Sequence, residues 1–202
     1  MKGLYEWGVN KVYVQIKGIK EWNPRFERYI KGTAPEVYKV VEGSFKSITY
    51  GEKVFPTSTG KDEVKEEMSI TLVNDDGEEI VVQSCWTGLS RGLINTLCSL
   101  GEVGKINISL WLSNNWYATA YVRSWGKLLG WLMDMEEQNK YIEKVELPTG
   151  KTQNFYHKLE AELKERSLKL KSMSIERELG IDVDQPTNEA KPLPEDFSEM
   201  PF

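Results

Sequence analysis

Apolar and polar residues alternate with a period of two in several stretches of the chain, which predicts strands with one buried face. The range 38–52 is also rich in residues that favour strands and contains one interior glycine, Gly43, at which a strand can bend. The range 68–73 alternates in the same way, and after the turn at 74–77 another apolar stretch covers 79–86. Two such stretches joined by a short turn that contains glycine predict a β-hairpin.

A different period follows this hairpin. Leucines recur every three or four residues around 90–100, and Gly101 stands where a helix would end. Alternation returns over 105–112, and the turn at 113–115 leads into a further strand at 116–124. The order of one bent strand, a hairpin, a helix and a second hairpin predicts a mainly β fold. It is the order of a five-stranded oligonucleotide/oligosaccharide-binding (OB) barrel with one helix between strands 3 and 4.

We expect four segments along the chain. An N-terminal extension, residues 1–37, precedes an OB-fold domain of residues 38–150. Residues 151–180 are expected to form a C-terminal helix, because apolar residues from Phe155 onward recur on one helical face. Residues 181–202 contain prolines, scattered acids and few apolar residues, which predicts a disordered acidic tail.

The second hairpin is expected to turn both polar residues and rings to its outer face. By alternation this face carries Lys105, Asn107, Ser109 and Trp111 on one strand and Tyr117, Thr119, Tyr121 and Arg123 on the other. A tryptophan on a polar face is explained by cross-strand aromatic pairing, by cover from the N-terminal segment, or by a surface on which a ligand stacks. These interpretations stay open at this point.

The net charge of -5 is distributed unevenly along the chain. Residues 1–61 carry 11 Lys and Arg against 6 Asp and Glu, residues 62–180 carry 14 against 19, and residues 181–202 carry one Lys against 6 acids. Ten aromatic residues fall within the basic first segment. Rings and cations together are what base stacking and phosphate attraction require, although core aromatics and solvated lysines explain the same composition.

The sequence offers little for catalysis or metal binding. One histidine, His157, and two cysteines, Cys85 and Cys98, are too few for a structural zinc site, and residues 101–105 lack the glycine spacing of a phosphate loop. We therefore expect no enzyme, no cofactor and no metal. No apolar stretch approaches the length of a membrane span, and the first residues lack the apolar stretch of a signal peptide. We expect a soluble, cytoplasmic protein with no membrane partner.

The end of the chain is an acidic peptide with an apolar tip. Its characteristic residues are Glu195, Asp196, Phe197, Glu199, Met200, Pro201 and Phe202. This peptide resembles the C-terminal tail of bacterial and phage single-stranded DNA-binding proteins, which is acidic and mobile and ends in Pro-Phe. In that family the tail is recognised by replication, recombination and repair proteins. The body of the chain, from Tyr38 to about Phe155, looks more like phage-type members than like the bacterial housekeeping protein, which implies the cytoplasm of a bacterial host.

We therefore expect a non-catalytic protein that binds single-stranded DNA without sequence preference. It would coat and protect the strand during DNA replication, recombination and repair, and recruit partner proteins through its tail. The alternative is an OB-fold adaptor that binds polypeptides of a replisome and has no nucleic-acid affinity of its own. The sequence sets no oligomeric state.

The residues expected to contact DNA fall into three groups. The first group combines stacking residues, which are Trp111, Tyr117, Tyr121 and Trp86, with phosphate contacts, which are Lys46, Arg91 and Arg123. A second group, expected where the groove begins, contains Tyr50, Lys53 and Phe55. The third group, on an N-terminal arm that closes over the strand, contains Trp22, Arg25, Phe26 and Arg28. In place of an arm, the N-terminal residues could supply an extra strand.

Overall fold

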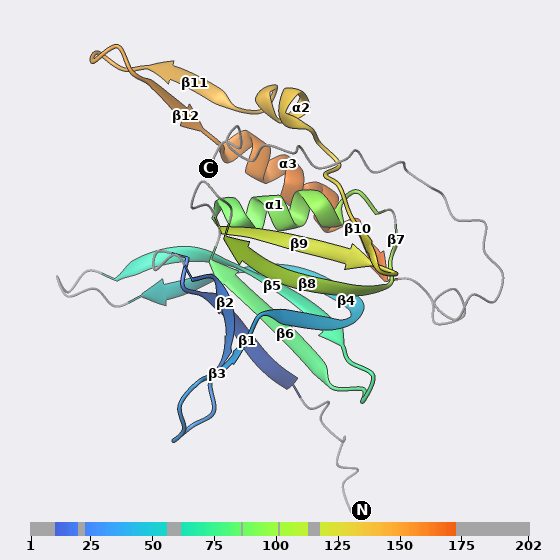
Figure 1. Cartoon of the computed structure of the whole chain (residues 1–202). Coiled ribbons are helices and arrows are strands. Elements are labelled where there is room, and N and C mark those ends of the chain that lie inside the picture. The colour runs from blue at the N-terminus through green and yellow to red at the C-terminus, as the bar shows by residue number, and fades with distance from the viewer. Residues whose placement is uncertain are drawn as a thin grey trace, which may run out of the picture.

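The computed structural model describes residues 11–19, 23–55, 62–85, 87–100, 102–112 and 118–172, and for Phe55 and Ser172 it describes the backbone alone. In this part the fold is mainly β. Nine strands form one sheet that curls strongly into a half-barrel, and the helices α1 (Gly88–Leu97) and α3 (His157–Ser167) lie on the side of β9 (Figure 1). No helix in these residues is long and apolar enough to span a bilayer.

In spatial order, the strands of the sheet are β10 (Lys127–Leu128), β9 (Ala118–Ser124), β8 (Lys105–Leu112), β4 (Val40–Phe55), β5 (Glu63–Val73), β6 (Glu79–Cys85), β1 (Lys11–Lys17), β2 (Arg25–Arg28) and β3 (Glu36–Tyr38). Neighbours pair antiparallel, except β1 and β6, which are parallel. The remaining elements are β7 (Glu102–Val103), which pairs with β13 (Lys171–Ser172), the hairpin of β11 (Glu143–Glu146) and β12 (Thr152–Phe155), and α2 (Met135–Asn139).

The period-two stretches of the sequence are strands in the structure. The predicted bent strand is β4, the first hairpin is β5 and β6, the helix is α1, and the second hairpin is β8 and β9. Gly43 is required by a close approach, because a Cβ there would lie 2.7 Å from the carbonyl oxygen of Val73. The irregularity of β4 falls slightly later, at the register shift between Phe45 and Ser47.

The pairing of the sheet differs from a closed five-stranded barrel. Within the section β9-β8-β4-β5-β6, closure would require the two end strands, β9 and β6, to pair with each other. Instead β6 pairs with β1 on its free side, and β9 pairs with β10. The sheet is therefore continued at both ends, and its curl gives a half-barrel.

The described part of the N-terminal extension contributes strands to this same sheet. The parallel contact of β1 with β6 places Val14 against Val82, and β2 then adds Phe26 beside Ile16. All four side chains belong to the main hydrophobic core. Burial of these apolar side chains explains why β1 and β2 join the sheet, whereas β3 is exposed at all three positions and pairs with β2 alone.

The C-terminal helix is shorter than the sequence predicts. Residues 152–155 form β12, which pairs with β11 in a hairpin that projects from the body (Figure 1). The turn at Leu147–Lys151 has its own backbone hydrogen bonds and a glycine, Gly150, with a φ of 74°. The helix α3 begins only at His157 and ends at Ser167. It buries Leu159 and Leu163, as predicted, whereas Phe155 is exposed on the hairpin.

Candidate functional site

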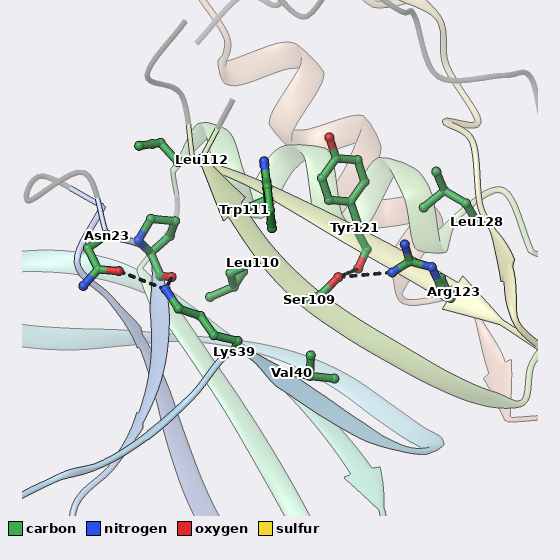
Figure 2. A pocket seen from close by; sticks show the side chains of 11 residues that line it. Asn23, Lys39, Val40, Ser109, Leu110, Trp111, Leu112, Tyr121, Arg123 and Leu128 are labelled. Atoms are coloured by element: carbon green, nitrogen blue, oxygen red, sulfur yellow. Dashed lines mark hydrogen bonds between the residues drawn. The ribbon is translucent and has the colours of Figure 1, made fainter. Parts of the chain in front are cut away.

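A groove of about 610 Å³ lies on the outer face of β8 and β9. Its floor carries Ser109, Trp111, Tyr121 and Arg123, and its opposite wall is formed by Asn23, Pro24, Lys39 and Val40 (Figure 2). The groove opens where β4 and β8 diverge, since the paired part of β4 with β8 starts at Val40 opposite Ser109.

Strand alternation positions the rings of the floor. Ile108 and Leu110 point into the core, so the residues that alternate with them on β8 point outward. Trp111 is one of these residues and is 63% exposed. Tyr121 lies on β9 opposite Ser109, one diagonal step from Trp111, and the two rings rise from the sheet in the same direction (Figure 2). Partial burial raises the pKa of the Tyr121 hydroxyl, so it is neutral at physiological pH.

Two cations line the groove. Arg123 donates weakly from Nη1 to Ser109 Oγ at 3.5 Å, and no Asp or Glu of the described residues forms an ion pair with it. Lys39 donates from Nζ to Asn23 Oδ1 at 2.9 Å and to the carbonyl oxygen of Pro24 at 3.1 Å. None of the described residues that line the groove is acidic. Among the described residues, the groove therefore combines apolar rings with two cations that form no ion pair with a carboxylate.

The other cations predicted to contact DNA are held by carboxylates. Lys46 pairs with the buried Glu79, Lys53 with Glu67 at 3.0 Å, Arg25 with Glu27 at 2.6 Å, Arg28 with Glu36 at 3.6 Å, and Arg91 with Glu160 at 2.9 Å. Arg91 also lies 4.0 Å from the centre of the Tyr156 ring, so it joins α1 to the start of α3. These side chains have structural contacts away from the groove lining.

Two aromatic residues predicted to contact DNA, one from the arm and one from the start of the groove, have packing roles. Phe26 is fully buried among the core residues, so its ring is inaccessible to a base. Tyr50 is half-buried, and its hydroxyl forms a 2.7 Å hydrogen bond with Ser167 Oγ of α3. Burial raises the pKa of this tyrosine strongly. Alternation also predicted an outward position for Thr119. In the structure Thr119 pairs with Trp111 across the two strands and is buried.

Several predicted residues lie outside the described part of the chain. They are Trp22, Trp86, Tyr117 and the tail residues Glu195, Asp196, Phe197, Glu199, Met200, Pro201 and Phe202. The side chain of Phe55 is likewise not described. In the sequence, Trp22 directly precedes Asn23 of the groove wall, and residues 113–117 connect the two strands of the floor.

The wall of the groove was missed by sequence reasoning. Lys39 reaches the groove because the chain turns between β3 and β4, and its bonds to Asn23 and Pro24 join segments 15 and 16 residues apart. No local period marks such a contact. Alternation did find the floor, since it predicted the outward positions of Trp111, Tyr121 and Arg123.

The described residues offer no group of three His, Cys, Asp or Glu side chains that could hold a metal ion. Cys85 and Cys98 are free thiols, and burial raises the pKa of Cys98 to about 12. A thiol with so high a pKa is a poor nucleophile. The chemistry that the groove itself offers is ring stacking, hydrogen bonding and attraction of anions.

Comparisons of the chain with protein-family models, with curated proteins and with solved structures find no match.

Proposed function

We propose that the protein binds single-stranded DNA in the groove on β8 and β9, without sequence preference. The observation that carries this proposal is the combination of exposed Trp111, Tyr121 beside it, and the cations Arg123 and Lys39 in one hollow with no acidic lining residue described. A polynucleotide with unpaired bases presents both flat ring faces and regularly spaced phosphates. The bases thus have aromatic rings to stack on in the groove, and the phosphates have cations.

The energetics favour a single strand over a duplex. Stacking on a protein ring contributes about 1 to 3 kcal/mol per base, but it requires a base whose face is free, and in a duplex these faces are stacked on each other. Every base has such a face, so the contact discriminates little among sequences. Phosphate attraction to Arg123 and Lys39 adds a term that weakens with salt.

The OB fold and the cellular role belong to this proposal too. The central elements follow the order of an OB barrel, and the resemblance of the C-terminal peptide to the tail of single-stranded DNA-binding proteins supports the same role. On this view the protein coats and protects single strands in replication, recombination and repair. The peptide from Glu195 to Phe202 recruits the proteins that act there, and no catalysis is involved.

The deciding experiment is a titration of fluorescein-labelled oligo(dT), about twelve nucleotides long, followed by anisotropy at two salt concentrations. We expect saturable binding that weakens with salt, and Trp111→Ala is expected to lower the affinity about 5- to 150-fold. The matched control is Tyr13→Ala, because Tyr13 is a similarly exposed ring on β1, far along the sheet order.

Two outcomes would contradict the proposal. One is the absence of saturable binding at low salt, which favours the adaptor that binds polypeptides. The other is an equal loss of affinity in the Trp111 and Tyr13 variants, which means that the groove is not the site. Oligo(rU) in the same assay determines whether DNA is preferred over RNA.

A further inference from the structure

A second exposed tryptophan, Trp125, lies beyond the groove at the turn between β9 and β10. It is 54% exposed, and it forms this two-residue turn together with Gly126. Its φ is 52° and that of Gly126 is 76°. Positive φ at both central residues is the pattern of a type I′ hairpin turn, in which Asn-Gly is the favoured pair.

A tryptophan at this position is unfavourable for the fold. Bulky side chains rarely adopt a positive φ, and in the part of the chain that the structure describes Trp125 is the one residue other than glycine that does so. Burial in the core does not compensate for the strain, because more than half of the side chain is exposed. Strain without a packing benefit is characteristic of residues kept for binding.

The surroundings of Trp125 continue the groove. Trp125 lines a neighbouring hollow of about 220 Å³ with Lys105, Asn107 and Arg123, and Arg123 lines both hollows. Trp125 comes six positions after Thr119, the residue of β9 that pairs with Trp111. At about 3.3 Å per residue the two tryptophans mark a track of about 20 Å. A stacked strand with about 3.4 Å per nucleotide covers this length with about six nucleotides.

The charges of the two hollows differ. In the second one, Glu42 is part of the lining, and Lys105 forms ion pairs with Glu42 at 3.3 Å and with Asp75 at 2.9 Å. Phosphates are therefore attracted mainly on the Arg123 side. A base can still stack on Trp125, because stacking requires no net charge.

We infer that Trp125 is a second stacking platform, which holds a base of the same single strand at the end of a track that starts at Trp111 and passes Arg123. This inference rests on the proposed function. It extends the site from one groove to a path along the whole outer face of the β8–β9 hairpin, and it assigns the unfavourable turn residue a role in DNA binding.

The test uses Trp125→Asn and Trp125→Tyr in the full chain with the same oligo(dT). Asparagine suits the turn but cannot stack, so the affinity is expected to fall about 5- to 150-fold. The midpoint of thermal unfolding should stay the same or rise, because the strain is removed. Trp125→Tyr restores a ring and should bind nearly as the unsubstituted protein does. The slope of log affinity against log salt should be unchanged in both variants, since no cation is lost.

The outcomes separate the inference from the proposed function. If Trp125→Asn binds normally while Trp111→Ala is weakened, the second platform is wrong and the groove stands. A loss in Trp125→Asn that tyrosine does not restore, or a loss accompanied by a lower unfolding midpoint, assigns the residue to the turn and overturns the inference. If the unsubstituted protein binds no oligo(dT), both fail. Tyr13→Asn, on β1, is the matched control and should leave binding unchanged.

Discussion

Two regions of one sheet carry rings and cations together, and they use them differently. In the strands from β1 to the end of β4, Phe26 is in the core, Tyr50 lies under α3, and Arg25, Lys46 and Lys53 are bound to carboxylates. On the outer face of β8 and β9, Trp111 is exposed, and the Arg123 guanidinium donates to a serine hydroxyl and forms no ion pair among the described residues. Similar residue types therefore stabilise the fold in one region and remain accessible in the other.

The local balance of charge therefore does not show which cations are accessible to a ligand. Residues 1–61 have a surplus of cations, but the buried acids Glu27 and Glu79 are placed so that each pairs with neighbouring cations. Glu79 alone accepts contacts from Lys11 and Lys46. A cation that compensates a buried carboxylate cannot leave it without cost, so it is a poor partner for phosphate.

The largest expected difference between the regions is in stability. Phe26→Ala removes a fully buried ring and is expected to lower the free energy of unfolding by about 3 to 5 kcal/mol. Trp111→Ala removes an exposed ring and should change it by about 0.5 kcal/mol or less. Urea unfolding followed by circular dichroism measures both. If Phe26→Ala does not fold, Phe26→Leu gives a smaller loss in the same direction. An equal loss in the two alanine variants would contradict the division.

The next effect concerns the cations. Arg123→Gln should weaken oligo(dT) binding several-fold and reduce the slope of log affinity against log salt by about 0.7, the contribution of one neutralised phosphate on a single strand. Lys46→Gln, in the other region, should leave this slope unchanged and lower stability instead, because Glu79 loses one of its two cations. Anisotropy titrations over a series of salt concentrations measure the slopes of both variants. A reversed pattern, with the slope reduced by the Lys46 variant alone, would move the phosphate path to the first region.

Much of the central fold could be predicted because it depends on local pattern. Alternation in β5 and β8 and the leucine period of α1 are each readable within about ten residues, and they also identified the outward position of Trp111. The short hairpin of β11 and β12 could not be predicted in this way. Its strands are exposed at every position, so no buried face imposes a period.

Contacts between segments that are distant in the chain could not be predicted from the sequence. The parallel pairing of β1 with β6 joins Lys11 to Glu79, and no pattern inside either strand specifies it. The ion pair of Lys46 with Glu79 joins residues 33 positions apart, so a count of lysines cannot say which ones are neutralised. The groove wall at Lys39 has the same origin. Alternation identifies which face a residue occupies, but tertiary pairing decides whether its charge is available.

The smallest expected effect is on the pH dependence of stability in the first region. The Tyr29 hydroxyl at 2.5 Å is the main cause that lowers the pKa of the buried Glu27 below its ordinary value of 4.5, and Arg25 contributes in the same direction. A carboxyl whose pKa is lower in the folded than in the unfolded chain stabilises the fold at neutral pH. This contribution is lost as the pH falls from the pKa of the unfolded chain through the lower pKa of the folded chain. Tyr29→Phe removes the main cause, so its unfolding free energy should fall less steeply between neutral pH and about pH 3.5 than that of the unsubstituted protein. Urea unfolding at several pH values measures the two curves.

At pH 7 the same variant should bind oligo(dT) normally, because the polar groups around Glu27 serve the fold. If the variant instead had an unaltered acid response but weakened DNA binding, Tyr29, which is exposed just after β2, would belong to the nucleic-acid path, and the two regions would not differ as described.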